Sequence, residues 1–259
     1  MAKIKFLGTC SGTEPMKNMH HTSFILEVNG VNYWFDAGEN CAHYAYTTGV
    51  DVMNTKALFI SHTHIDHTGG LANLFHCIRK LIVRENRSLI NDKLKVFIPK
   101  KEILDCAITL TTNGRSSEFD IVEYNGVQDG VLFEDENVKI TALHNRHLGE
   151  DGSQGWHSYS YLIEVEGKKI VFSGDVKNSL ELEELIGTHC DLLLHETGHH
   201  KVEKVLNYVV SKPVKKMRFI HHGREILNEY EKCDNLCKEY QNKYGVDIKI
   251  AHDLMIEEI

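Results

Sequence analysis

The chain has 259 residues, of which 42% are hydrophobic and 25% charged, and its formal net charge is −8. This composition is ordinary for a globular protein, and the acidic balance argues against a broad basic surface for long nucleic acid. No apolar run approaches the roughly 18 residues of a membrane span, the start MAKIKFLGTCSG does not read as a signal peptide, and seven cysteines without a CxxC pair favour reduced thiols in the cytoplasm.

The first third of the chain is predicted to consist mostly of strands. Residues 3–8 form one, and residues 23–38 (SFILEVNGVNYWFDAG) form two strands joined at VNG, which is a hairpin signal. Residues 55–62 (TKALFISH) are a further buried strand. Residues 69–86 carry apolar side chains at helical spacing.

The rest of the chain alternates between strand and helix patterns. Helices are predicted at 100–114, where Gly114 ends the pattern, and at 180–187, 202–210 and 224–245. Strands are predicted at 95–99, 119–126, 138–144, 158–167, 168–175, 190–196, 216–222, 246–253 and 254–259. This interleaving predicts a layered α/β or α+β fold. Because no linker, charge block or repeat divides the chain, a single domain over residues 1–259 is expected.

The stretch SHTHIDHTGG, residues 61–70, gathers three histidines and an aspartate directly after a strand. His62 and His64 are two residues apart, so they project to the same side of an extended backbone. Gly69 and Gly70 allow a tight turn into the next helix. Imidazole and carboxylate groups are costly to crowd together unless a cation holds them, and zinc favours such ligands. The stretch therefore predicts a metal site.

With its HxHxDH pattern the sequence resembles the metallo-β-lactamase superfamily. The resemblance extends to FLGTCSGTEP, TSFILEVNGVNYWFDAGEN, VFSGDV, LLLHETG and FIHHG, which are similar to the ribonuclease Z branch and together cover nearly the whole chain. It implies an α/β fold of the αββα sandwich type, in which two central mixed β-sheets are flanked by helices. It also implies two divalent metal ions at one edge of the paired sheets.

Carried over position by position, the resemblance implies seven metal ligands: His62, His64, Asp66, His67, His147, Asp175 and His221. The first two histidines would bind one metal together with a histidine from ITALHNRHLG. Asp66 and His67 would bind the other together with a histidine from FIHHG, and Asp175 would bridge both. Zinc is the expected metal, and manganese and iron are alternatives.

Two ligand positions have a neighbouring alternative. His147 is preferred to His144 because it lies at the family's usual distance beyond the preceding strand. His221 is preferred to His222 because alternation along the strand places it on the same face as Phe219.

Three residues are expected to be catalytic. Asp66 can orient the attacking hydroxide with its second carboxylate oxygen. Glu196 and His199, with His200 as the alternative histidine, resemble the glutamate loop of the ribonuclease Z branch, where the pair helps protonate the leaving oxygen. Asp36 in WFDAG is expected to orient a ligand histidine.

The predicted function is a cytoplasmic binuclear metal hydrolase that cleaves a phosphodiester bond in a small molecule or a short nucleic acid. Residues 82–130 contain no Gly- and basic-rich arm of the kind that transfer-RNA-processing members carry. A thioester or lactone hydrolase is the alternative, although HNRHLGED lacks the HTPGHT-like turn of those enzymes. A β-lactamase would place a cysteine among the ligands, and a non-catalytic member would lack one or more ligands.

Two further expectations concern binding partners. Relatives often dimerise, so a homodimer is possible for this chain. Five basic residues around the last ligand strand could steer a phosphate toward the site: Lys212, Lys215, Lys216, Arg218 and Arg224.

Overall fold

The structure is a computed structural model that describes residues 1–115, 119–151 and 155–259. The chain divides into two compact units. Unit 1 comprises Met1–Gly8, Pro15–Val127 and Asp253–Glu258, and unit 2 comprises Thr9–Glu14, Gln128–His252 and Ile259. The single domain over residues 1–259 stays a prediction.

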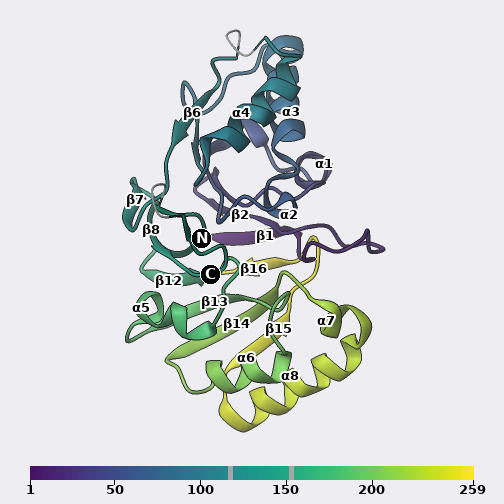
Figure 1. The fold of residues 1–259 in the computed structure, drawn as a ribbon, viewed down its shortest axis with the longest axis vertical. Helices are drawn as coiled ribbons and strands as arrows, with labels where there is room; N and C mark the ends of the chain where they lie inside the picture. The colour runs from purple at the N-terminus through teal and green to yellow at the C-terminus, as the bar shows by residue number, and fades with distance from the viewer. Residues whose placement is uncertain (116–118, 152–154) are drawn as a thin grey trace. The chain divides into compact units, whose positions relative to one another are not determined.

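Unit 1 is built on a seven-stranded sheet with the order β16-β1-β2-β3-β4-β5-β6 (Figure 1). Its strands are β1 (Lys3–Gly8), β2 (Ser23–Val28), β3 (Val31–Phe35), β4 (Thr55–Phe59), β5 (Leu94–Phe97), β6 (Val122–Asn125) and β16 (Ile256–Glu258). The pairs from β3 to β6 are parallel and the others antiparallel, so the sheet is mixed. The β2–β3 hairpin is confirmed, and its turn residues Asn29 and Gly30 both have positive φ, as a type I′ turn requires.

Both faces of the unit 1 sheet carry apolar side chains. The helical segments are α1 (Cys41–Thr47), η1 (Val52–Asn54), α2 (Ile65–Thr68), α3 (Leu71–Glu85) and α4 (Lys101–Thr112). Leu74 and Ile78 of α3 belong to the same buried cluster as Trp34 of β3. A ladder of stacked rings, with centroids 4.8–5.1 Å apart, lines neighbouring strands: Phe24, Phe35, Phe59 and Phe97. Apolar residues on both faces are typical of a sheet that forms an inner layer.

Unit 2 contains a second seven-stranded mixed sheet, with the order β15-β14-β13-β12-β11-β8-β7 (Figure 1). Its strands are β7 (Gly130–Glu134), β8 (Val138–His144), β11 (Tyr159–Val165), β12 (Lys168–Phe172), β13 (Cys190–Glu196), β14 (Val214–Ile220) and β15 (Asp247–Ile250). The pairs from β12 to β15 are parallel. A separate two-stranded pair consists of β9 (Glu150–Asp151) and β10 (Gly155–Trp156).

Helices cover one side of the unit 2 sheet. They are η3 (Ser179–Leu182), α5 (Glu183–Ile186), α6 (Val202–Val209), α7 (Arg224–Asn228) and α8 (Tyr230–Tyr244). Leu206 of α6 and Cys237 of α8 share a buried cluster with Leu193 and Met217 of the sheet. None of the described helices has the length and apolar character that crossing a membrane would require.

The parallel strands bring polar residues to one edge within each unit. In unit 1, Asp36 follows β3 and His62 follows β4 shortly after its end. In unit 2, Asp175 follows β12, Glu196 ends β13 and His221 follows β14. Carboxyl ends of parallel strands are where α/β proteins usually place functional side chains.

One predicted helix is wrong in its extent. Residues 224–245 form two helices, because the backbone leaves the helical region at Glu229, with φ −131° and ψ 42°. The amide of Glu229 still bonds to the carbonyl of Glu225, and Cys233 bonds to Glu229, each at 3.0 Å. The break therefore sacrifices neither of these backbone hydrogen bonds, and no glycine or proline marks it in the sequence.

Candidate metal centre

The predicted ligands of the HxHxDH stretch converge in unit 1. His64 caps α2 with extended backbone, so the chain turns into the helix directly after it. Nε2 of His62 lies 3.1 Å from Nδ1 of His64, and the rings of His62 and His67 are 4.0 Å apart. Oδ2 of Asp66 lies 3.4 Å from Nε2 of His67. Four groups that can bind a metal thus form a series of close contacts beyond the end of β4.

The carboxylate of Asp36 holds this arrangement in place through contacts with Ser61 and His67. This carboxylate lies 2.7 Å from Nδ1 of His67 and accepts the amide and hydroxyl protons of Ser61 at 2.7 and 2.8 Å. Asp36 thus contacts His67, one of the predicted ligands, and its role in orienting a ligand histidine stays a prediction. A carboxylate on Nδ1 fixes the ring and makes Nε2 a more basic ligand. Asp36 also has a positive φ of 51°, which is uncommon for a residue other than glycine.

The two glycines after the motif, Gly69 and Gly70, lie where the chain packs closely against its neighbours. Gly70 has φ −87° and Gly69 has φ −61°, values that any residue adopts. A Cβ on Gly70 would collide with the carbonyl oxygen of Gly38 and lie 2.7 Å from Sγ of Cys41. Gly70 is therefore needed, because the start of α3 packs directly against the loop that follows β3.

Unit 2 contains a second convergence of metal-ligating groups. One ligand atom from each of Asp175, Glu196, His199 and His221 lies within 4.8 Å of the others. Nδ1 of His221 is 3.3 Å from Oδ1 of Asp175 and 3.7 Å from Oε2 of Glu196. Nδ1 of His199 lies 3.1 Å from Oε1 of Glu196.

The geometry favours His147 over His144 as a ligand. Nε2 of His147 lies 3.6 Å from Oδ2 of Asp175. His144 instead donates its backbone amide to Oδ1 of Asp129, and its Nδ1 lies close to Oδ2, both at 2.6 Å. Its ring also stacks on Trp156, with centroids 4.1 Å apart.

The geometry likewise favours His221 over His222. Nε2 of His222 donates to the carbonyl of Ala251 at 2.7 Å, and burial lowers the pKa of His222 to about 4. The alternation argument for His221 was wrong, because Phe219 belongs to the core cluster shared with α6 and α8. His221 lies beyond the strand and has a positive φ of 47°, which turns its side chain away from the strand pattern.

Glu196 and His199 each stabilise the charged form of the other. Burial works to raise the pKa of Glu196, but the hydrogen bond from His199 and the nearby imidazole of His221 outweigh it and lower the pKa. The hydrogen bond to Glu196 in turn raises the pKa of His199, although burial opposes it. The His200 side chain is only 5% exposed and donates Nε2 to the carbonyl of Val176 at 2.9 Å, whereas the His199 side chain is 44% exposed. His199 is therefore the histidine that a substrate can reach.

The donor set in unit 2 fits a divalent cation. Imidazole nitrogen and carboxylate oxygen are the ligands that zinc and manganese take in proteins. Asp175 and Glu196 are both buried, and the charge of Asp175 acts to raise the pKa of Glu196. Two buried carboxylates repel each other, and a cation bound at Asp175 would offset that cost.

The basic cluster around β14 is not a preformed phosphate site. Four of its members pair with carboxylates: Lys212 with Glu183, Lys215 with Asp191, Arg218 with Asp247 and Arg224 with Glu14. Arg218 is also buried. Lys215 lies at the start of β14, whereas His221 follows its end. The carboxylates offset the positive charge that these four side chains would offer a phosphate.

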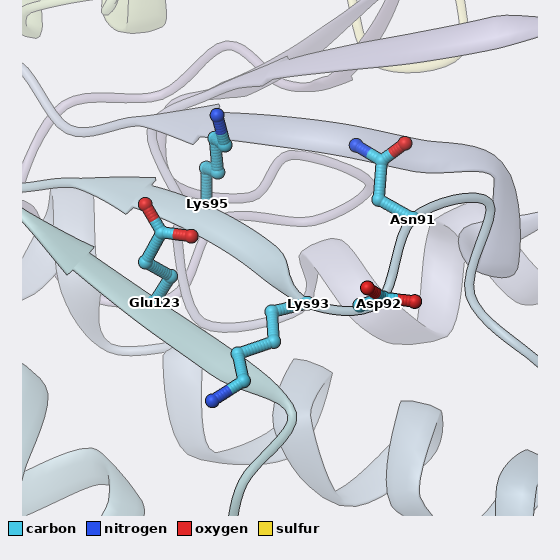
Figure 2. Close-up of a pocket in the computed structure, with 5 residues that line it drawn as sticks. All are labelled: Asn91, Asp92, Lys93, Lys95 and Glu123. Atoms are coloured by element: carbon cyan, nitrogen blue, oxygen red, sulfur yellow. The ribbon is translucent and has the colours of Figure 1, made fainter.

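A hollow of about 610 Å³ in unit 1 is separate from the motif. It is lined by Asn91, Asp92, Lys93, Lys95 and Glu123 (Figure 2). Lys95 and Glu123 are partners across β5 and β6, near the amino ends of those strands. His62 follows the carboxyl end of the parallel strand β4, at the opposite edge of the sheet. The lining mixes both signs of charge and offers no set of catalytic groups.

Several polar residues that hydrogen-bond to residues of the site were not predicted from the sequence. Ser61 binds Asp36, and the hydroxyl of Ser173 accepts the amide proton of Glu196 at 3.1 Å. Asn145 accepts the amide proton of His147 at 3.1 Å. These residues carry no charge, and their only signal in the sequence is their position beside a predicted ligand or at a strand end.

Comparisons with known proteins identify a family and related sequences. Residues 2–238 match the protein-family model described as Anti-Pycsar protein Apyc1. Ribonuclease BN of Proteus mirabilis is 31% identical over 142 residues, a match that covers 54% of this chain and 44% of that protein. Ribonuclease Z of Bacillus subtilis is 26% identical over 256 residues, covering 80% of this chain and 79% of that protein. In the first of these matches the chain spans less than half of the relative's length.

A solved structure gives the fold. The metallo-β-lactamase fold protein YhfI of Bacillus subtilis has a TM-score of 0.76 and 15% identity, and the match covers 100% of both chains. The predicted fold class is confirmed: two mixed β-sheets flanked by helices, as in the metallo-β-lactamase fold. This fold and the clustered histidines and carboxylates support the use of a divalent metal.

Proposed function

The chain belongs to the Anti-Pycsar protein Apyc1 family, and we propose that it is a binuclear metal-dependent hydrolase that cleaves a phosphodiester bond. It is a member of the metallo-β-lactamase superfamily, in the ribonuclease Z-like branch. The observation that carries the proposal is the convergence of Asp175, Glu196, His199 and His221 in unit 2. This set combines metal ligands with a carboxylate–imidazole pair that can transfer a proton.

The proposed metal ligands are the seven that the resemblance to the superfamily implies: His62, His64, Asp66, His67, His147, Asp175 and His221. Zinc is the proposed metal because the set is rich in imidazole, and manganese or iron could use the same ligands. Bound divalent cations lower the pKa of water toward neutrality and stabilise an anionic transition state.

Two side chains act on the reacting groups, and a third positions one of them. Asp66 orients the attacking hydroxide through its second carboxylate oxygen. Glu196 fixes His199 by accepting from its backbone amide at 2.9 Å and from Nδ1 at 3.1 Å. Nε2 of His199 is then the nitrogen that gives its proton to the leaving oxygen.

The proposed substrate is a small phosphodiester or a short nucleic acid. Relatives named ribonuclease Z and ribonuclease BN support a diester. The net charge of −8 and the carboxylate partners of the basic cluster favour a small substrate over a long polyanion. A cytoplasmic location and a homodimer stay predictions from the sequence.

The test is hydrolysis of bis-p-nitrophenyl phosphate by protein loaded with zinc or manganese, with a thioester and a lactone assayed in parallel. Diester cleavage that disappears in Asp175→Ala is the expected result. Asp105→Ala, which removes an exposed carboxylate of α4, is the control and should keep full activity. Cleavage of only the thioester or the lactone would contradict the proposal. RNA and cyclic nucleotides follow as substrates once diester cleavage is established.

A further inference from the structure

A continuous chain of hydrogen bonds runs through the interior of unit 2 beneath the converging ligands. Its members are four side chains, each no more than 1% exposed: Asn145, Ser158, Ser160 and Ser173. Burying four polar side chains together is costly unless every group finds a partner. Each of the four does, and the partners lead to residues of the proposed site.

The first part of this chain of hydrogen bonds fixes the segment around His147. Asn145 and Ser158 bond twice, because the amide of Asn145 donates to the carbonyl of Ser158 at 2.9 Å and the hydroxyl of Ser158 donates to the carbonyl of Asn145 at 3.1 Å. Oδ1 of Asn145 accepts the amide proton of His147 at 3.1 Å. The hydroxyl oxygen of Ser158 accepts the amide proton of Leu148 at 3.2 Å. The backbone amides of two consecutive residues, His147 and Leu148, are thus held by buried side chains.

The second part leads to the strand ends. Nδ2 of Asn145 donates to the hydroxyl oxygen of Ser160 at 3.1 Å, and that hydroxyl donates to the carbonyl of Ser173 at 2.6 Å. The hydroxyl oxygen of Ser173 accepts the amide proton of Glu196 at 3.1 Å. Asp175 follows Ser173 by two residues. Asn145 therefore stands between the segment of His147 and the strand ends that carry Asp175 and Glu196.

We propose that Asn145 is a positioning residue that sets the orientation of His147 relative to Asp175 through Ser160. The inference rests on the proposed function, since it assigns a task to residues that act through the proposed ligands. A primary amide is suited to the task because it offers an acceptor and a donor on one rigid plane. Aspartate would lack the donor toward Ser160, and an aliphatic residue would lack both groups. Groups that orient metal ligands typically change metal affinity 10- to 100-fold when they are removed.

The experiment compares Asn145→Ala, Ser160→Ala and the double variant. Zinc affinity is measured by competition with a chromophoric chelator, and kcat and KM are measured for diester cleavage. Each single variant should weaken zinc binding about tenfold or more and lower kcat with little change in KM. The double variant should bind zinc no more weakly than the worse single variant, because both changes break the same chain of hydrogen bonds.

The matched control is Ile163→Val, which removes one methylene from a buried side chain of the same strand as Ser160. It should lower thermal stability and leave zinc affinity and kcat unchanged. Unchanged zinc affinity in Ser160→Ala, or a loss as large in Ile163→Val, would overturn the inference, and Ser160→Ala decides the matter even if Asn145→Ala does not fold. A wild-type protein that binds zinc but cleaves no diester would refute the proposed function instead, while the affinities would still decide the role of Asn145.

Discussion

At the scale of a single residue, Gly198 shows how little space there is around the candidate centre. A Cβ at this position would lie 2.5 Å from Nδ1 and 2.6 Å from Cε1 of His221. Contacts this short force one of the two groups to move, and the backbone of Gly198 is held between Glu196 and α6. His221 is therefore the group that a larger residue would displace.

We accordingly expect Gly198→Ala to lower diester kcat about 100-fold or more, because a displacement of about 1 Å at a reacting centre has effects of this size. The free energy of unfolding should fall by only about 1–3 kcal/mol. Gly126→Ala is the matched control, since a Cβ there would meet only Oη of Tyr124 at 3.4 Å. Full activity in Gly198→Ala would contradict the combined expectation that the added Cβ displaces His221 and that His221 takes part in the reaction.

The role of His199 can be separated from metal binding by changing the leaving group. A p-nitrophenolate leaves without a proton, whereas the alkoxide of a dinucleotide needs one. His199→Asn should therefore lower kcat for a dinucleotide about 10²–10⁴-fold and change the rate for bis-p-nitrophenyl phosphate by less than about tenfold. His76→Asn, which alters an exposed histidine of α3, should affect neither substrate. Equal losses on both substrates would argue against proton transfer by His199.

At the scale of elements, α6 depends on a side chain from another helix. Its N-cap residue Lys201 makes no side-chain cap. Oε2 of Glu225, in α7, accepts the amide proton of Val202 at 2.9 Å instead. This carboxylate supplies both a hydrogen bond and a negative charge where the helix dipole favours one.

Glu225→Ala should lower the free energy of unfolding by about 1 kcal/mol, the usual cost of a lost cap. Glu225→Gln should cost less, because the amide oxygen can still accept while the charge is gone. Denaturant titration of both variants, monitored by circular dichroism, measures the difference. Equal stability of wild type and Glu225→Ala would mean that water replaces the carboxylate at no cost.

Strands and helices with a strong pattern could be predicted from the sequence. The turn at Asn29 and Gly30 and the apolar spacing of 69–86 determine local structure by themselves, and both predictions are confirmed. The pattern of 224–245 contains no signal for the break at Glu229, and α1 lacks a side-chain cap at Asn40. Such features depend on tertiary packing, which a local pattern does not contain.

The candidate site could be predicted only where charged residues mark it. The HxHxDH stretch and Asp175 stand out because their chemistry is unusual at strand ends. The choice between His144 and His147 could not be settled from spacing alone, because Asp129, which lies close to the ring of His144, is fifteen residues away in the sequence. Neutral residues such as Asn145 gain their significance only from partners that the fold brings together.

At the scale of the whole molecule, acid should weaken the fold partly through Asp191 at the start of β13. Burial works to raise its pKa, but bonds from the amide of Lys169, from Lys215 and from His189 outweigh it and hold the pKa at about 2. The folded value lies below the unfolded value of about 4. Asp191 therefore stabilises the fold above about pH 4, and this contribution is lost as the pH falls toward 2.

We expect Asp191→Asn to lower the free energy of unfolding by about 1–2 kcal/mol at pH 6 and to flatten its decline between pH 5 and pH 2. Denaturant titrations of the metal-free protein at several pH values measure both effects. Asp105→Asn, on the exposed face of α4, should follow the wild-type curve. A wild-type decline that is unchanged in Asp191→Asn would assign the acid sensitivity to other carboxylates.

The left-handed backbone at Asp36 and His221 has a consequence for how the protein can evolve. Side chains other than glycine cost about 1 kcal/mol in this conformation, so the buried partners of Asp36 and His221 must offset that cost. His221→Gly would relieve the backbone strain, but it would also empty a buried position beside Asp175 and should therefore lower both the stability of the metal-free protein and catalysis. A library sorted for thermal stability and a library sorted for activity should therefore retain the same side chains at these two positions.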